Sequence, residues 1–266
     1  MGCGNIGTVL AKAVDEGVVE NAELVALYDV ARERCEKLAS ELKRFKPRIA
    51  SCFEELLGSK PDVVVEAASQ QAVREYGLRV LESGADLIVL SVGALMDRDL
   101  LAKLVEAARR KRRHIYTPSG AIAGLDAVYA LSLNGIRSVR LVTRKPPRAL
   151  KDAPYVREKG INLDETREPT TIYVGPASEA VKYFPANVNV AAALSLAAKK
   201  EATVEIVADP TVERNIHEIH VDSEASKLTI RVENTPSPMN PRTSYLAALS
   251  AIALLKRLAD ERLWIA

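Results

Sequence analysis

The chain has few cysteines and few histidines, which limits its thiol and metal chemistry. Its 266 residues include three of each, and Cys3, Cys35 and Cys52 all precede Pro61. They match no ligand spacing, so we expect no metal site, and no thiol remains in the second half for a thioester route. So few unpaired cysteines are typical of a reducing compartment, and we expect a cytoplasmic protein.

The sequence also lacks long apolar runs, aromatic residues and a strong net charge. No stretch is long enough to span a bilayer, and the first residues do not form a signal peptide. The formal net charge is +2 and aromatic residues make up 5%. The basic run at 109–113 is best explained as the C-terminal end of a helix, where cations interact favourably with the helix dipole. We therefore expect neither a membrane nor a nucleic-acid partner.

A glycine pattern opens the chain. The first ten residues, MGCGNIGTVL, contain a G-x-G-x-x-G run, and apolar residues then recur at helical spacing over 8–18. In a dinucleotide-binding turn, the first two glycines allow a tight turn and close approach of the pyrophosphate, and the third lets helix and strand pack. The free N–H groups of a following helix suit a phosphate. We expect this segment to bind a dinucleotide through Gly2, Gly4, Asn5, Ile6 and Gly7.

A carboxylate follows at the expected distance. The apolar run 24–28 ends in Asp29, about twenty residues beyond the last glycine, where an acidic residue accepts a hydrogen bond from the ribose 2′-OH of NAD. Arg32 and Arg34 can neutralise a 2′-phosphate, although on a charged helix face both are better explained as solvated groups. We expect NAD, with NADP as the alternative.

Strands and helices alternate through the first half of the chain. Apolar strand-length runs lie at 62–66, 86–90 and 113–117, and helical patterns lie at 71–82 and 97–110. This rhythm predicts an α/β fold with a Rossmann-type, doubly wound parallel sheet. Ligands bind at the carboxyl ends of such strands, which makes Ser69, Gln70 and Gly93 candidate cofactor-binding residues.

The first strand of this sheet is missing, because the glycine turn begins at residue 2. Its neighbours would keep unpaired backbone groups without it. Three explanations are open: a start assigned at an internal codon, a sequence recorded from a later point, or a fold that dispenses with a central strand. We favour the first and expect codons for a short Val/Ile-rich strand upstream of Met1.

The second half has a different rhythm. Alternating strands at 139–144, 171–174, 203–208, 215–221 and 227–232, with helices at 178–183 and 188–199, predict a second α+β domain with a mainly antiparallel sheet. Residues 145–169 form a polar loop that suits a lid or a partner contact. We expect a dinucleotide-binding domain at 1–120, joined by a returning C-terminal helix at 241–266. Residues 121–240 would form the domain for substrate binding and dimerisation.

Several segments resemble the L-aspartate dehydrogenase family. They are 66–73 (EAASQQAV), 86–94 (DLIVLSVGA), 119–127 (SGAIAGLDA), 184–192 (FPANVNVAA), 215–219 (NIHEI) and 240–249 (NPRTSYLAAL). The resemblance implies a homodimer and reversible NAD(P)-linked oxidation of L-aspartate to iminosuccinate, which yields oxaloacetate and ammonia or supplies NAD biosynthesis. The chain departs from the family pattern in its absent first strand and in a longer loop at 151–168.

Oxidation of an amino acid at its α-carbon needs a group that transfers a proton, and three histidines are candidates for it. His114 lies in a basic run and is expected to be structural or solvated. His217 and His220 lie three apart on one predicted strand and therefore on opposite faces. Spacing does not choose between them, but the resemblance points to His217 as the catalytic residue.

The resemblance also places Ala121, through its backbone amide, and Asn189 at the nicotinamide. Asn187 is equally polar, and one of the two asparagines can instead cap the helix that follows. Candidates for holding the substrate carboxylates are Asn187, Arg144, Lys145, Arg242 and Thr243. Each of these is explained equally well as a surface group or a helix cap.

Two other functions stay open. A homoserine dehydrogenase-like oxidoreductase is the nearest enzyme alternative, and a substrate screen would separate the two activities. A dinucleotide-sensing protein without turnover is the alternative outside enzymes; the truncated cofactor domain favours it, and His217 in an intact motif argues against it.

Overall fold

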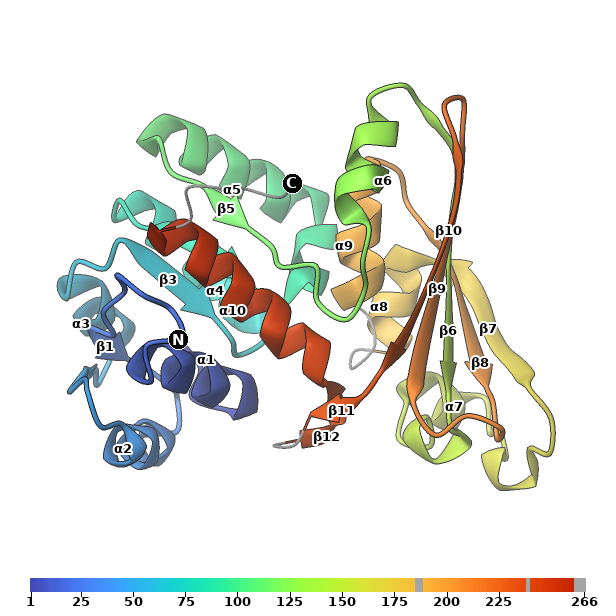
Figure 1. Ribbon diagram of the computed structural model, residues 1–266, viewed down its shortest axis with the longest axis horizontal. Helices are drawn as coiled ribbons and strands as arrows, with labels where there is room; N and C mark the ends of the chain where they lie inside the picture. The colour runs from blue at the N-terminus through green and yellow to red at the C-terminus, as the bar shows by residue number, and fades with distance from the viewer. Residues whose placement is uncertain (185–188, 238–239, 261–266) are drawn as a thin grey trace. The chain divides into compact units, whose positions relative to one another are not determined.

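The computed structural model describes residues 1–184, 189–237 and 240–260, apart from the side chains of 240–243 and 260. The chain divides into two compact units. The N-terminal unit contains residues 1–118 and 248–266, and the C-terminal unit contains residues 119–247. Figure 1 labels the helices and strands of both units.

The N-terminal unit alternates strands and helices, as the sequence predicts. Every strand pair described in it is parallel. Its strands are β1 (Ala26–Leu27), β2 (Arg48–Ile49), β3 (Val63–Glu66), β4 (Asp86–Val89) and β5 (Ile115–Tyr116). Its helices are α1 (Asn5–Asp15), α2 (Arg32–Glu41), α3 (Phe53–Gly58), α4 (Gln70–Glu82), η1 (Val92–Met96), α5 (Arg98–Lys111) and most of α10 (Tyr245–Asp260). The prediction of a Rossmann-type parallel fold is confirmed.

The sheet of this unit consists of two separate ladders among the described residues, β1 with β2 and β3 with β4 and β5. Backbone hydrogen bonds of the first residues of the chain link the two ladders. The Met1 amine donates to the Val65 carbonyl at 3.0 Å, and the Ala67 amide donates to the Met1 carbonyl at 2.9 Å. On the other side, the Gly2 amide donates to the Tyr28 carbonyl at 2.8 Å. This is the bonding pattern of a strand parallel to both neighbours, present only at their carboxyl ends.

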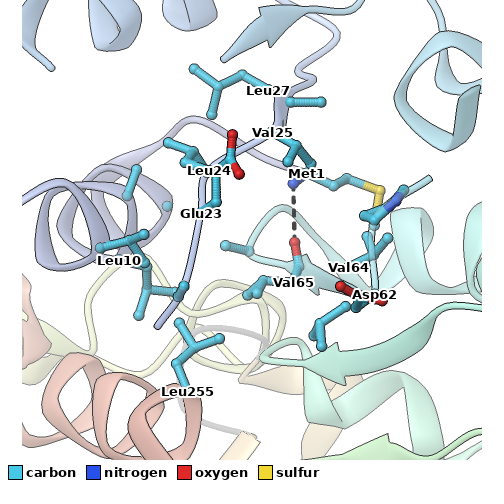
Figure 2. A pocket seen from close by; sticks show the side chains of 18 of the residues that line it. Met1, Leu10, Glu23, Leu24, Val25, Leu27, Asp62, Val64, Val65 and Leu255 are labelled. Carbon is cyan, nitrogen blue, oxygen red and sulfur yellow. Dashed lines mark hydrogen bonds between the residues drawn. The ribbon is translucent and has the colours of Figure 1, made fainter. Parts of the chain in front are cut away.

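A cavity of about 590 Å³ lies in this gap, lined by residues of both β1 and β3. Figure 2 shows Leu10, Leu24 and Leu255 around it, with the bond from Met1 to Val65 at its edge. Helix α10 contributes to the lining and also packs against α1 and the segment after it, through Ile252 and Leu255 on the cluster around Val14. The described strands therefore leave an apolar space where the sequence predicts a first strand.

The C-terminal unit is built on a mixed sheet in the order β10-β9-β6-β8-β7. Its strands are β6 (Ile136–Lys145), β7 (Thr170–Pro176), β8 (Thr203–Ala208), β9 (Asn215–Ser223) and β10 (Lys227–Asn234), and the pair β11 (Pro236–Ser237) and β12 (Asn240–Ser244) stands apart. Only β6 and β8 pair in parallel within the main sheet; its other described pairs are antiparallel. This agrees with the predicted mainly antiparallel α+β fold.

Helices cover one face of that sheet: α6 (Leu125–Ser132), α8 (Ala177–Tyr183) and α9 (Asn189–Ala198) (Figure 1). On β6 the alternation of buried and exposed side chains puts Val139, Leu141, Thr143 and Lys145 on the covered face. The predicted loop at 145–169 folds into η2 (Pro147–Ala149), α7 (Pro154–Glu158) and η3 (Leu163–Glu165). Leu150 and Leu163 are buried in it, and Lys151 pairs with Asp164.

Candidate cofactor and active sites

The glycine turn has the shape that its sequence predicts. A side chain at Gly7 would place its Cβ 1.9 Å from the Gly2 carbonyl oxygen, and one at Gly2, where φ is +86°, would lie 2.6 Å from the Ala67 carbonyl. Only glycine tolerates these approaches. A Cβ at Gly4 would meet nothing within 4 Å, so the backbone is open on that side.

The start of α1 suits a phosphate. Gly4 is the N-cap residue and supplies no side-chain acceptor, and the first turn, which includes Asn5 and Ile6, holds no acidic residue. The first N–H groups of a helix have no partner within it and carry the positive end of its dipole. An open backbone at Gly4 beside these donors therefore fits a pyrophosphate group.

Asp29 is held against the same turn. Its Oδ2 accepts from the Cys3 amide at 2.7 Å, and its Oδ1 accepts from the Ala31 amide at 2.9 Å. The side chain is only 7% exposed, and Arg34 lies 4.0 Å away. Arg32 instead pairs with Glu36 at 2.9 Å. Each carboxylate oxygen can accept a second hydrogen bond, as a ribose hydroxyl requires.

At the carboxyl ends of β3 and β4, Glu66 ties two loops together. This buried carboxylate accepts from the Ala68 amide at 2.8 Å, and from the Ser91 amide and hydroxyl at 2.9 Å each. The predicted binding residues stand beside these loops: Ser69 caps α4 by accepting from Ala72, Gln70 begins α4, and Gly93 is buried in η1. The sequence analysis gave Glu66 no role, although a carboxylate that ends an apolar strand was a usable signal.

In the C-terminal unit, His217 lies on the helix-covered face of the sheet. It stands opposite Thr143 in the β6–β9 pairing, and the Thr143 hydroxyl shares a hydrogen bond of 3.0 Å with its Nδ1. The Nε2 atom is thereby left as the ring's other hydrogen-bonding atom. His217 is 4% exposed. Burial, aided by the positive charge of Lys145, lowers its pKa to about 3, so the ring is neutral at neutral pH.

The other two histidines have different surroundings. His220 lies on the opposite face of β9, as the spacing predicts, where it is partly exposed and stands opposite Arg140. His114 belongs to the N-terminal unit, is largely exposed and lies 3.7 Å from Asp86.

Lys145 and Arg144 are neighbours in sequence but lie on opposite faces of β6. Lys145 shares the face of Thr143 and His217, and burial lowers its pKa to about 8. Arg144 lies on the other face, where its guanidinium is 3.7 Å from Asp209 and 3.8 Å from Glu218. Of the two candidates for a substrate carboxylate, only Lys145 shares a face with the histidine.

The remaining candidates are placed in part. Ala121 is buried, and its carbonyl accepts from the Asn234 side chain at 3.0 Å. Asn189 is exposed and begins α9. Asn187 lies outside the described residues, as do the side chains of Arg242 and Thr243.

Two polar residues on the helix-covered face of the C-terminal sheet were not predicted from the sequence. Thr143 and Asn234 occupy inward positions next to apolar inward residues of the same strands, Leu141 on β6 and Val232 on β10. A polar residue at an inward position of an alternating strand was the available signal.

The described residues contain no group of three or more His, Cys, Asp and Glu side chains that could hold a metal ion. No described helix is long and apolar enough to cross a membrane.

Comparisons with known proteins match both halves of the chain. Residues 126–258 match the family "Aspartate dehydrogenase, C-terminal", and residues 2–118 match "Homoserine dehydrogenase, NAD binding domain". Among solved structures, aspartate dehydrogenase from Thermotoga maritima superposes with a TM-score of 0.77 at 27% identity, covering 100% of this chain and 97% of that one. A protein of gentamicin A biosynthesis in complex with NAD shares the fold, with a TM-score of 0.56 at 13% identity, covering 97% of this chain and 83% of that one.

The curated relatives are similar over nearly their whole length. L-aspartate dehydrogenase from Methanosarcina barkeri is 50% identical over 260 residues, which cover 97% of this chain and 95% of the relative. The enzyme of the same name from Methanothermobacter thermautotrophicus is 46% identical over 98% of this chain and 95% of the relative. Together with the glycine turn, Asp29 and the buried His217, these matches show that the chain belongs to the L-aspartate dehydrogenase family.

Proposed function

We propose that this protein catalyses the reversible, NAD(P)-dependent oxidation of L-aspartate to iminosuccinate, which water converts to oxaloacetate and ammonia. The observation that carries the proposal is the buried, neutral His217 in a chain 50% identical to a relative named L-aspartate dehydrogenase. The full-length identity supports aspartate over homoserine, which is matched only through a cofactor-domain family.

The dinucleotide would be held by the turn from Gly2 to Gly7 and by the first N–H groups of α1. Ser69, Gln70 and Gly93 would line the same carboxyl edge of the strands, and Ala121 and Asn189 would contact the nicotinamide end. We propose NAD as the preferred cofactor, because Asp29 lies beside the glycine turn with acceptor capacity left on both oxygens. Arg34, at 4.0 Å from Asp29, is the residue through which NADP would be accommodated.

A bound nicotinamide cofactor would supply the acceptor for the hydride of the substrate's α-carbon. For that, the substrate ammonium must first lose a proton, and a neutral imidazole accepts one. The pKa of His217, lowered to about 3, keeps the ring unprotonated throughout the neutral range. Thr143 holds Nδ1, which leaves Nε2 to face the substrate. The Lys145 ammonium, on the same face, supplies a cation for a substrate carboxylate.

A pair of histidine variants tests this assignment. His217→Ala should lower turnover with L-aspartate by roughly 10²- to 10⁴-fold, as expected for a lost acid or base, while NADH affinity barely changes. His220→Ala is the matched control on the opposite face of the same strand and should keep most of its activity. A fully active His217→Ala protein would refute the assigned role.

The outcome also separates the alternatives. Appearance of NADH absorbance on adding L-aspartate and NAD at alkaline pH supports the dehydrogenase, and oxidation of homoserine in its place supports the other enzyme. NADH binding without turnover of any amino acid would support a dinucleotide sensor.

We also propose that the protein is a cytoplasmic homodimer and that its product can supply NAD biosynthesis. The open face of the C-terminal sheet carries alternating charges that suit a second copy, among them Arg140 paired with Glu205 and Arg231 paired with Glu218. Sedimentation as a monomer at micromolar concentration would contradict the dimer.

A further inference from the structure

Asn234 is the last residue of β10 and lies on the helix-covered face of the C-terminal sheet. It stands opposite Asn215, and Val232 stands opposite His217 in the same pairing. Residues directly opposite one another share a face, as do residues two apart on one strand. Asn234 and His217 are therefore diagonal neighbours, with an expected separation of roughly 7–8 Å.

The orientation of the Asn234 amide is fixed by one hydrogen bond. Its Nδ2 donates to the Ala121 carbonyl at 3.0 Å, and a carbonyl can only accept, so the other atom of the amide is the oxygen Oδ1. The loop that carries Ala121 packs tightly on this strand, since a Cβ at Gly124 would lie 2.3 Å from the Ile230 side chain. The amide therefore cannot simply rotate to exchange its two ends.

Oδ1 has no partner. Among the side chains that the structure describes, it is the one buried nitrogen or oxygen without a hydrogen bond. Buried polar atoms are nearly always paired, and an unpaired acceptor destabilises the fold unless something else satisfies it. Asn234 is 3% exposed and His217 is 4% exposed. The two side chains are therefore about equally shielded, and a ligand that reaches the histidine can reach the asparagine as well.

We propose that Asn234 is a ligand-binding residue whose Oδ1 accepts a hydrogen bond from an N–H group of a bound ligand. The inference rests on the proposed function, which brings two such groups to this protein: the α-amino group of L-aspartate and the carboxamide of the nicotinamide ring. Both offer N–H donors of the kind that the free acceptor requires. Asn234 thereby favours a ligand that carries an N–H group at the point of contact, because a ligand without this donor leaves Oδ1 unpaired.

Two ligand pairs that differ in this donor provide the test. Succinate has the carbon skeleton and carboxylates of L-aspartate without the amino group. The acetylpyridine analogue of NADH keeps the ring carbonyl and lacks the N–H₂ group. Dissociation constants are measured by calorimetry, with NADH present for the dicarboxylates so that no turnover occurs. The proteins are the unaltered chain, Asn234→Ala, and Asn134→Ala, which removes an exposed amide in the turn after α6.

Asn234→Ala should bind one of the two N–H ligands roughly 5- to 100-fold more weakly, the range expected for one lost hydrogen bond in a buried site. The partner that lacks the donor should change far less. The substitution also removes the hydrogen bond to Ala121, and this loss affects the binding of both ligands of a pair alike. The difference between the two changes in dissociation constant therefore measures the contribution of Oδ1 alone. A selective loss for L-aspartate identifies the amino group as the donor, and one for NADH identifies the carboxamide.

Asn234→Gln keeps both an acceptor oxygen and an amide donor for the Ala121 carbonyl, so it should retain the selectivity, and it provides a readout if the alanine variant does not fold. The Asn134→Ala control should match the unaltered chain for all four ligands. Equal changes within both pairs, or none, would overturn the inference. If the unaltered chain does not oxidise L-aspartate, the proposed function is wrong, but NADH and its analogue still test Asn234. If His217→Ala is inactive as expected and neither ligand pair shows a selective loss, the proposed function stands and only the inference about Asn234 is wrong.

Discussion

The gap between β1 and β3 gives a quantitative prediction. A variant with four extended residues alternating between valine and isoleucine, fused ahead of Met1, should fill the cavity and join the two ladders of the N-terminal sheet. The bonds of Met1 to Val65 and Ala67, and that of Gly2 to Tyr28, already start a parallel ladder on each side. The fused segment would extend it along Val63–Glu66 and Ala26–Leu27.

The expected gain in the free energy of unfolding is a small difference between burial and hydrogen bonding on one side and conformational entropy on the other. The cavity of about 590 Å³ is lined mainly by apolar residues, together with polar ones such as Asn21 and Asp62. Each added side chain that meets the apolar part contributes about 1.5–3 kcal/mol by burial. New backbone hydrogen bonds add about 0.5–1.5 kcal/mol each. Ordering each residue costs about 1–2 kcal/mol for the backbone and about 0.5–1 kcal/mol for the side chain. For four residues, burial and ordering nearly cancel at the middle of these ranges, so about five new hydrogen bonds leave a net gain of about 5 kcal/mol. That gain corresponds to a rise in Tm of roughly 10–20 °C.

The fusion also changes the charge of the buried amine. Burial lowers the pKa of the Met1 amine because the charged form is desolvated there. A peptide bond removes that charge and keeps the N–H that donates to Val65.

Calorimetric melts of the fused and unfused chains measure the gain. A matched extension of four residues rich in proline and aspartate is the control, because it cannot pair with either strand. Equal melting temperatures for the three proteins would refute the reasoning, as would an equal rise for both extensions.

Two further predictions concern cofactor choice and pH. Asp29→Ala should weaken NAD binding more than NADP binding, since it removes the acceptor for the 2′-OH and the repulsion of a 2′-phosphate; fluorescence titration showing proportionate losses would contradict this. The pKa of His217 is about 3 in the folded protein against an ordinary 6.5, so the unfolded chain takes up a proton between these values and the folded chain does not. Stability should therefore fall as pH drops below 6.5, with a contribution approaching about 1.4 kcal/mol per pH unit. Urea unfolding at pH 7, 6 and 5 should show a shallower pH dependence in His217→Gln, and an unchanged one would place the titration elsewhere.

Short-range patterns in the sequence were sufficient to predict several features of this protein. The glycines of the first turn are specified by backbone space, as the 1.9 Å approach at Gly7 shows. Period-two and helical spacing predicted most elements from β3 to β10, and the same alternation put His217 and His220 on opposite faces. Short elements with little patterning, such as α3 with its buried Phe53 and Leu56, carried too weak a signal to be predicted.

Only the tertiary structure decided which polar groups meet. Thr143 and His217 are 74 residues apart and are joined by the register of β6 on β9, and Asn234 and Ala121 are 113 residues apart. Register is a property of a strand pair, and a slip of one residue would turn every side chain to the other face. Local patterns show that a residue points inward, but its partner depends on which strands pair and in which register. That is why the sequence led to His217, while the structure was needed to find the partners of His217 and the free acceptor of Asn234.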